Sequence, residues 1–554
     1  MGGYFQSVYV HRDLDQTPSG KASLQQILAW DNNCRSTHPR CNILVPRLPT
    51  RVIDVASMNG ACRLYESAGA HNNYMTLSHC WGNLKILTTT KDNLARHKKV
   101  IDFGTLPKTF QDAIEVTRHM GIQYIWIDSL CIVQDDLDDW ARESSKMASI
   151  YQNSYLTLAA TAARDRSEGL FKPRAVETCS LEICDKDYPD RSITLLARRG
   201  RTHDCLRGVQ GDPWMNSDEK PLMTRAWVYQ ERLLSRRLLH FAADEMIWEC
   251  HTETDCECSL IASRDPIVKD RKERGITDDE GLSDRSIFEI LTSGEQRDSD
   301  AETQRWYQLI KNYTLLNITN DEDRLPAFSG IASSLIEAEN YVAGIRKSYA
   351  VRDLLWFSLA STKPRRAHSY LAPSWSWASI IGGYGNFTIM YNYPAIWDAP
   401  GTSVLAEIKD VFTVKSTSDP FGRVKAGEMK IAGRCVKATV LEKDGGWIGS
   451  EWGSHRLRIE IPSLPGRDVG GEAMIDTIDD ARSAVGLSIT LLAMLETESY
   501  VYFLMLALRS LFSRKLRRIG AMRVSRGGQA TGNLTKLAAE SILDKSRSTT
   551  LVLV

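Results

Sequence analysis

The strongest constraint on the fold is an alternation of strand-like and helix-like segments between residues 73 and 162. Short apolar runs predict strands at Asn73–Cys80, Ile122–Asp128 and Ser154–Ala162. Between them, Leu106–Gly121 and Asp138–Tyr151 carry apolar side chains at helical spacing. The middle strand is apolar on both faces, as is typical of a central parallel strand. The pattern predicts an α/β fold built on a parallel, doubly wound sheet.

Other segments of the 554-residue chain show different patterns. A typical domain length of about 150 residues predicts three or four units. The expected parts are a polar, irregular N-terminal extension (1–50), an α/β domain (51–262), a charged linker or helical insert (263–304), a helical region containing PSWSWAS (305–395), a β-rich C-terminal region (396–525) and a polar tail (526–554). Within the α/β domain, Arg164–Leu222 is expected to be an insertion with its own hairpins, and Leu238–Cys250 a strand or hairpin. Trp375 and Trp377 are predicted to lie on one face of a strand, as core or domain-interface anchors.

Composition narrows the classes of function. The chain has 69 basic and 69 acidic residues, and this balance argues against nucleic acid as a main partner. The first residues lack a signal-peptide pattern, and the 12 cysteines therefore predict reduced thiols in a cytoplasmic protein. The most apolar window, Leu487–Leu508, is interrupted by two glutamates, so two buried strands or a helix are expected there and a membrane span is not.

One helical segment, TRAWVYQERLLS (Thr224–Ser235), places a carboxylate on an apolar face. At 3.6 residues per turn, that face holds Trp227, Val228, Glu231, Leu234 and Ser235, while Arg225, Tyr229, Arg232 and Arg236 fall on the other. Glu231 has no opposite charge at i±3 or i±4. A buried unpaired carboxylate costs several kcal/mol or takes up a proton, so Glu231 needs a partner from elsewhere in the fold or a ligand.

Polar groups follow the predicted strands. Ser78 and His79 lie at the end of the first strand, before Trp81–Gly82, and Asp128 follows the second. Ligands of open α/β sheets bind beyond the carboxyl ends of the strands, so these groups are candidates for one site. Strand-end capping is the alternative for each residue taken singly.

Glu143 is a second helical carboxylate and the runner-up to Glu231. Lys146 lies three residues after it, so an ordinary ion pair explains its position. Glu231 has no such local explanation and is the preferred candidate.

Metal and thiol chemistry have weaker signals. Cys34-x3-His38-x2-Cys41 offers three ligands without an obvious fourth, and Cys250, His251, Cys256 and Cys258 fit a loop better than a zinc knuckle. We therefore predict no metal site, with zinc at the first cluster left open. A nucleophilic Cys80 or Cys131, assisted by His79 or His240, is conceivable but has no base assigned to it by the sequence. P-loop, dinucleotide-binding, GxSxG and HExxH motifs are absent from the sequence.

Three blocks of the chain resemble, in order and spacing, those of the fungal heterokaryon incompatibility (HET) domain. They are LSHCWG, the long block from LPKTFQDAIEVTRHMG to NSYLTLAAT, and TRAWVYQERLLSRRLLHF. Downstream, DRLPAFSGIA, YVAGI, APSWSWAS and RRIGAMRV are similar to segments that often follow this domain. One residue departs from the family pattern: related chains commonly carry Trp where this chain has Arg346.

The resemblance implies non-self recognition between fungal cells, ending in growth arrest or cell death, with self-association or another incompatibility protein as partner. HET domains also resemble TIR domains remotely. The resemblance thus implies a TIR- or flavodoxin-like parallel core with insertions, followed by helical and β-rich regions. Some TIR domains cleave NAD, and by element order the carboxylate matching their catalytic glutamate is Glu231.

Two functions follow as expectations. The first is an incompatibility protein that signals by regulated self-association. The second is an NAD-cleaving glycohydrolase in which Glu231 stabilises an oxocarbenium-like state and Ser78, His79, Trp81, Gly82, Asp128 and Trp227 bind the substrate. No bound cofactor is expected; NAD enters only as a candidate substrate. A HET-like fold recruited to other small-molecule chemistry is a weaker third reading.

Overall fold

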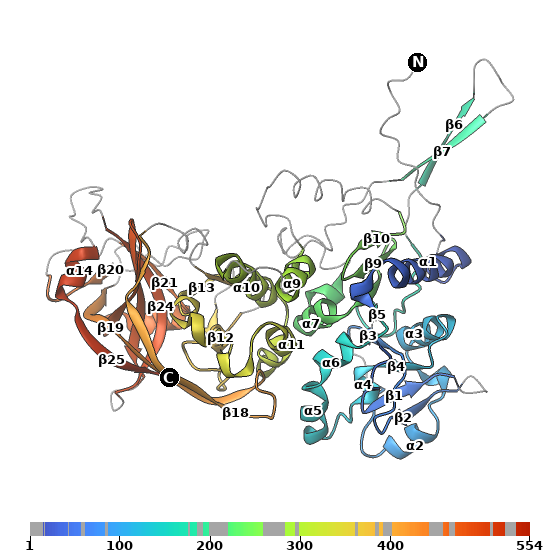
Figure 1. The fold of residues 1–554 in the computed structure, drawn as a ribbon, viewed down its shortest axis with the longest axis horizontal. Helices are drawn as coiled ribbons and strands as arrows, with labels where there is room; N and C mark the ends of the chain where they lie inside the picture. The colour runs from blue at the N-terminus through green and yellow to red at the C-terminus, as the bar shows by residue number, and fades with distance from the viewer. Residues whose placement is uncertain are drawn as a thin grey trace. The chain divides into compact units, whose positions relative to one another are not determined.

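The chain forms two compact units, Met1–Ser286 and Ile287–Val554. The computed structural model describes residues 15, 17–42, 44–56, 61–82, 87–174, 178–184, 192–198, 220–258, 283–293, 299–360, 364–382, 387–391, 401–441, 458–464, 471–509, 514–526 and 539–554. Figure 1 shows the elements of both units.

The first unit is built on an eight-stranded mixed sheet in the order β10-β9-β8-β5-β3-β4-β1-β2. Its strands are β1 Arg51–Asp54, β2 Arg63–Glu66, β3 Tyr74–Ser78, β4 Tyr124–Trp126, β5 Leu156–Ala159, β8 Arg237–Phe241, β9 Met246–Cys250 and β10 Thr254–Cys256. The central four, β4-β3-β5-β8, pair in parallel, whereas the outer strands pair antiparallel. In chain order the parallel strands read 2-1-3-4, which is the flavodoxin-like order. The predicted α/β class and parallel core are confirmed.

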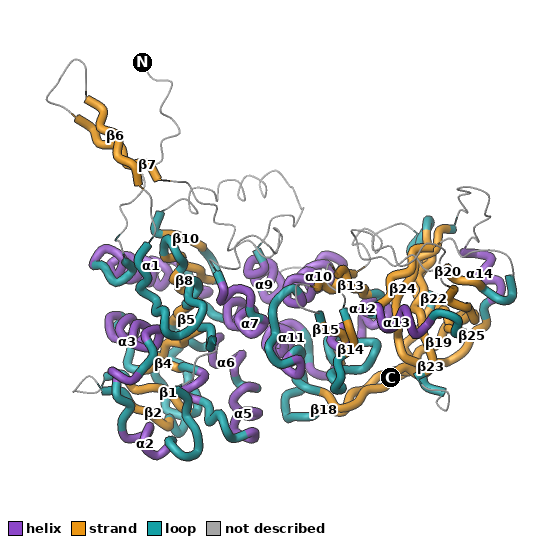
Figure 2. Tube along the Cα trace, turned by 180° about the vertical axis from the view of Figure 1, so that it is seen from behind, coloured by secondary structure: helices purple, strands orange, loops and turns teal. Residues whose placement is uncertain are grey.

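Helices cover both faces of this sheet. They are α1 Lys21–Thr37, α2 Leu94–Lys99, α3 Lys108–His119, α4 Asp128–Cys131, α5 Leu137–Ser144, α6 Met147–Gln152 and α7 Ala226–Leu234. Figures 1 and 2 place α1 and α3 on one side of the sheet and α5, α6 and α7 on the other. The 3₁₀ turns η1 Pro39–Cys41, η2 Phe103–Thr105 and η3 Pro221–Thr224 join some of them.

Several local predictions need correction. The helix predicted over Asp138–Tyr151 is two helices, because the Ser144 and Ser145 hydroxyls bond back to backbone carbonyls where α5 ends. The N-terminal extension, expected to be irregular, contains α1. The insertion at residues 164–222 includes a hairpin, as predicted, formed by β6 Thr178–Cys184 and β7 Ser192–Arg198. Most of the remaining insertion lies outside the described residues, and so does most of the charged segment 263–304.

The second unit combines helices with a nine-stranded sheet. Seven strands follow the order β17-β22-β23-β24-β25-β19-β18, and β20 and β21 pair with β19 and β24, respectively. The strands are β17 Ser403–Val404, β18 Ala406–Lys415, β19 Val424–Leu441, β20 Arg458–Glu460, β21 Gly471–Ile475, β22 Ser488–Glu496, β23 Tyr500–Leu508, β24 Leu516–Ser525 and β25 Arg547–Leu553. The sheet closes on itself because β19 pairs with β22 as well as with β25. The window 487–508 is thus two buried strands. The part of the chain that the structure describes has no helix with the length and apolarity that a membrane span needs.

The helices and short strand pairs of this unit precede or flank the large sheet. The helices are α9 Asp284–Thr292, which crosses the unit boundary, α10 Ser299–Thr314, α11 Pro326–Leu335, α12 Ala350–Asp353, α13 Ile478–Ala484 and α14 Ala539–Lys545; the 3₁₀ turns are η4 Asp321–Asp323, η5 Ala338–Asn340, η6 Lys347–Tyr349 and η7 Trp377–Ser379. The strand pairs are β11 Tyr341–Val342 with β12 Ile345–Arg346, β13 Trp356–Ala360 with β16 Phe387–Tyr391, and β14 Arg365–Arg366 with β15 Ile380–Ile381.

The PSWSWAS segment is a turn and a 3₁₀ helix, and the strand predicted there is wrong apart from β15. The Ser376 hydroxyl accepts a hydrogen bond from Ala378 N–H and donates to Ala343 O, so the segment forms a capped turn. Trp375 and Trp377 are nonetheless fully buried. The Trp377 indole donates to Gly344 O at 2.9 Å, which anchors the turn inside the second unit.

Candidate active site at the strand ends

The site lies where the parallel strands of the first unit end. Thr76 is the register partner of Trp126, so Ser78 on β3 and Asp128, the first residue of α4, are level at the same edge. Ser78 is also the register partner of Ala159, the last residue of β5. The strand order changes direction between β3 and β5, and such switch points are where doubly wound folds bind ligands.

Helix α7 brings Glu231 to Ser78. The Ser78 hydroxyl donates to Glu231 Oε2 at 2.5 Å. The helix starts after the 3₁₀ turn η3, and its last turn is closed by the Ser235 hydroxyl, which donates to the Glu231 carbonyl at 2.6 Å. Only 6% of Glu231 is exposed. The sequence prediction that this carboxylate is buried on an inward face is therefore correct.

Burial decides the protonation of Glu231. Loss of hydration raises the pKa of this carboxyl to about 7, and the negative charge of Asp128 acts in the same direction. Hydrogen bonds from Ser78 and Tyr151 and the positive charge of Arg225 oppose the shift without cancelling it. At neutral pH the group is therefore divided between its charged and neutral forms, which suits a residue that changes charge during a reaction.

Asp128 joins the ends of β3 and β4. Its Oδ2 accepts a hydrogen bond from the Trp81 indole at 2.7 Å, and Oδ1 accepts from Ser129 N–H at 2.6 Å and lies 3.9 Å from His79 Nδ1. The Asp128 side chain is 21% exposed, so it is the open side of the cluster. This carboxylate orients the indole and lies close enough to Glu231 to influence its charge.

His79 is neutral in this setting. Complete burial lowers the pKa of its imidazole to about 4, although Asp128 pulls in the opposite direction. Its ring meets Phe110 edge-on, with 5.0 Å between the ring centroids. Among the described residues, its buried Nε2 atom has no hydrogen-bond partner.

Gly82 and Trp227 complete the predicted set. Gly82 has φ of +67°, and a Cβ there would lie 2.4 Å from Asp165 Cβ, so both the backbone and the space require glycine. Trp227 is half-buried on α7, one turn before Glu231. The structure thus gathers Ser78 with Glu231, and Trp81 and His79 with Asp128, while Trp227 shares the helix of Glu231.

Glu143 lies in a different setting. It is on α5, where its Oε1 accepts hydrogen bonds from Lys146 Nζ and Thr50 Oγ1, both at 2.9 Å. The predicted i,i+3 ion pair with Lys146 is confirmed.

Three further residues belong to this region and were not predicted from the sequence. The Tyr151 hydroxyl on α6 donates to Leu77 O at 3.3 Å and is hydrogen-bonded with Glu231. Arg225 donates to His79 O at 2.6 Å, and Arg166 donates to Trp81 O at 2.7 Å. Arg225 precedes α7 in extended conformation, so the prediction that it lies on the polar face of this helix is wrong. Arginines that hold backbone carbonyls leave no periodic signal in a sequence.

The thiol alternative gains no support. Burial raises the pKa of Cys131 to about 12 and that of Cys80 above its ordinary value, so both thiols stay protonated near neutral pH. His240 is bonded to Thr161 Oγ1 at 2.8 Å and to Glu249 at 3.0 Å. Both ring nitrogens of His240 are therefore bonded to groups other than Cys80 and Cys131.

These features define a class of protein: a flavodoxin-like α/β domain with a buried glutamate at the strand ends. Comparison with family models shows which domain this is, because residues 74–231 match the model of the heterokaryon incompatibility protein (HET). The match begins at the first residue of β3 and ends at Glu231. Residues 74–231 are thus a HET domain, as their sequence blocks predicted. No curated protein and no solved structure matched the chain.

Proposed function

We propose that this chain is a fungal incompatibility protein whose HET domain triggers growth arrest or cell death when it assembles. The match of residues 74–231 to the HET family carries the proposal. Partners are further copies of the chain or another incompatibility protein, and the place of action is the cytoplasm. The balanced charge of 69 basic and 69 acidic residues supports a protein rather than a nucleic acid as partner.

Induced expression in a fungal host tests this role. Raising the concentration of the chain favours assembly by mass action. We expect loss of colony growth and viability as expression rises, with assemblies larger than a monomer on size-exclusion chromatography of the lysate. Normal growth in cells that hold abundant folded chain would contradict the proposal.

A second candidate function is cleavage of NAD within the same domain. The observation that favours it is the buried Glu231 with a pKa of about 7, held by Ser78 at the strand ends. As the bond between nicotinamide and ribose breaks, its electron pair leaves with neutral nicotinamide and positive charge develops on the ribose. An ionised Glu231 stabilises that charge, and water then adds to give ADP-ribose and a proton.

The other polar groups have supporting roles in this candidate. Ser78 orients the Glu231 carboxylate, and Asp128 holds the Trp81 indole, whose ring face, like that of Trp227, is suited to stack on a base. The neutral imidazole of His79 and the backbone at Gly82 are the remaining contacts proposed for the substrate. Because only the ionised carboxylate stabilises positive charge, the rate is expected to rise as pH increases through about 7.

Glu231→Gln separates the two functions, and Glu143→Gln is the matched control. Both positions are buried carboxylates on helices of the same unit, but Glu143 is paired with Lys146. The NAD-cleaving function predicts that NAD falls in cells expressing wild type or Glu143→Gln and is unchanged with Glu231→Gln at equal protein level. If cells die in all three strains while NAD stays constant, cell death is explained by assembly of the chain without NAD cleavage.

A further inference from the structure

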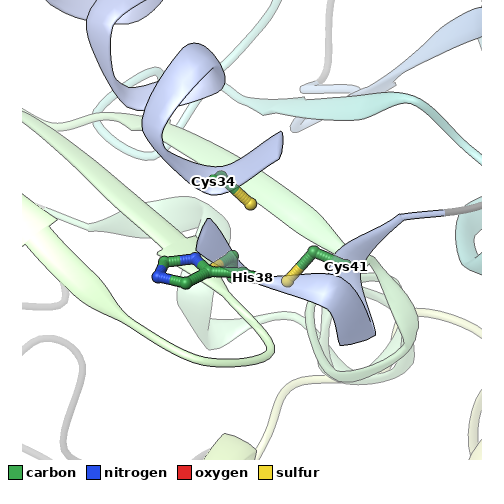
Figure 3. Close-up of side chains that lie close together, drawn as sticks. Cys34, His38 and Cys41 are labelled. Atoms are coloured by element: carbon green, nitrogen blue, oxygen red, sulfur yellow. The ribbon is translucent and has the colours of Figure 1, made fainter. Parts of the chain in front are cut away.

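Four metal-binding side chains converge at the edge of the first unit, separated from β3 by β8 and β5. Cys34 lies near the end of α1, His38 directly after it, Cys41 at the end of η1, and Cys250 at the end of β9. Their ligand atoms all lie within 4.8 Å of one another. Figure 3 shows that the side chains of Cys34, His38 and Cys41 lie close together.

The spacing and burial fit a tetrahedral ion. With Zn–S bonds of about 2.3 Å, the ligand atoms of a tetrahedral site lie roughly 3.5–4 Å apart. His38 Nδ1 is 3.3 Å from Cys250 Sγ, so little movement is needed to admit a cation between them. Cys34 and Cys41 are fully buried, and His38 and Cys250 nearly so. Such a closed set of four protein ligands is typical of a structural zinc site.

The surrounding contacts match those of metal ligands. The second ring nitrogen of His38, Nε2, lies 3.4 Å from a Glu253 carboxylate oxygen, which favours a proton on Nε2 and leaves the Nδ1 lone pair facing the thiols. Glu253 N–H donates to Cys250 Sγ at 3.3 Å. The buried Arg237 guanidinium donates to Cys34 Sγ at 3.3 Å and offsets the negative charge that three thiolates leave after one divalent cation is bound.

A disulfide explains less of this arrangement. It would use two of three clustered thiols and leave the third thiol, the imidazole and the Glu253 contact without a role. Cys34, Cys41 and Cys250 are all free thiols in the structure. The neighbouring group of Glu245, Cys256 and Cys258 has only three ligands among the described residues, and Glu245 already accepts a hydrogen bond from Cys258 N–H.

We propose that Cys34, His38, Cys41 and Cys250 bind a structural Zn²⁺ ion. The ion fastens the end of α1 and η1 to β9, where Trp30 already stacks on Trp248 and donates its indole N–H to Asp255. Cys250 follows Glu249, the partner of Arg232 on α7. Zinc therefore stabilises the sheet edge that supports the helix carrying Glu231. The site is independent of whether the chain cleaves NAD.

Metal content of the full-length chain tests the site. The chain is purified without metal-affinity chromatography, dialysed against a weak chelator and analysed by plasma mass spectrometry. We expect about one zinc ion per chain. Cys250→Ser should reduce the zinc retained by about tenfold or more, and Cys62→Ser, which removes a buried thiol elsewhere in the same unit, should retain it.

A second variant, His38→Cys, distinguishes loss of a ligand from loss of the fold. Four thiolates also bind zinc, so this variant should keep both the fold and the metal. Glu253→Gln should weaken zinc affinity by about 10-fold, the effect of losing an outer contact. Wild-type chain with negligible zinc, equal zinc in Cys250→Ser, iron in place of zinc, or a disulfide among these cysteines in the freshly purified protein would overturn the proposal.

Discussion

At the scale of single residues, Glu231 shows how a carboxylate is tolerated on an apolar helix face. The sequence left open a partner from another element or a ligand. The structure supplies hydroxyl groups, from Ser78 and Tyr151, with Arg225 near enough to act on the charge. Hydroxyl donors stabilise an ionised carboxylate less than a direct ion pair does, so burial dominates and the pKa stays near neutrality.

Replacement of Glu231 by glutamine should change the pH dependence of stability. The pKa of this carboxyl is about 7 in the folded chain against an ordinary 4.5, so its favourable contribution is complete below about pH 4.5 and is lost as pH rises through 7. Relative to wild type, Glu231→Gln should gain about 2–3 kcal/mol of unfolding free energy between about pH 5 and pH 8. Urea unfolding at the two pH values measures this; parallel pH profiles would contradict it.

Glu249 presents the opposite case, a carboxylate stabilised chiefly by a buried arginine. Burial acts to raise its pKa, but Arg232, through two hydrogen bonds of 2.6 and 2.8 Å, and His240 lower it well below its ordinary value. Glu249→Gln removes the carboxylate that accepts both of these hydrogen bonds from the buried Arg232 guanidinium, and should destabilise the first unit by about 3–5 kcal/mol. Glu66→Gln, which breaks the exposed pair with Lys98, should change stability by less than about 1 kcal/mol in the same denaturant titration.

At the scale of elements, an ion pair between Arg346 and Asp353 connects β12 with α12. The Arg346 guanidinium forms bonds of 2.8 and 3.2 Å with Asp353 and lies 4.3 Å from the centroid of the Tyr349 ring. Trp306 and Tyr307 are also within 6 Å of the guanidinium. The flat guanidinium cation of Arg346 is thus surrounded by aromatic rings.

Asp353→Asn should therefore be more damaging than an exposed change nearby. Asp353 is fully buried and also accepts hydrogen bonds from Arg346 N–H and the Tyr307 hydroxyl. Removing its charge should cost about 3–5 kcal/mol. The control Glu322→Gln, in the half-exposed pair with Arg423, should cost under about 1 kcal/mol. Thermal unfolding followed by circular dichroism compares the two; equal melting temperatures would refute the ion-pair argument.

Helices and strands were predicted correctly where apolar residues follow a regular pattern along the sequence. The prediction failed where polar side chains are part of the buried core. β3, β4 and β5 were predicted because buried parallel strands are apolar runs. Helix α1 was missed since its buried face includes Ser23 and Asp31, whose partners Glu257 and Tyr155 lie far along the chain. The strand β25 and helix α14 lie in the segment expected as a polar tail, because exposed residues dominate the strand.

The candidate site was predictable only in part, for the same reason. Strand ends can be read from apolar runs, so Ser78 and Asp128 were found and the structure brings them to one edge. Long-range partners cannot be read in this way: Cys250 lies 212 residues after His38, and only the fold brings their side chains within 3.3 Å. The zinc ligands were therefore seen in the sequence as an incomplete set of three.

At the scale of the whole molecule, each of the two units has a cluster of buried hydrophobic side chains of its own. One cluster around Leu222, Val228 and Leu238 belongs to the first unit, and a larger one along β22, β23 and β24 belongs to the second. Each unit also holds a buried ion pair of its own, Arg232–Glu249 in the first and Arg518–Asp476 in the second. A unit with its own core and its own satisfied charges is expected to fold by itself.

Residues 1–286 and 287–554, expressed separately, should therefore each unfold in one cooperative transition, and the full chain should show both transitions in calorimetry. Glu249→Gln should lower the melting temperature of the 1–286 transition by at least several degrees and leave the other unchanged, whereas Asp353→Asn should do the reverse. The chelator that removes zinc should affect only the 1–286 transition, because all four ligands belong to that unit. A single transition of the full chain that moves with every one of these changes would show that the two units fold as one.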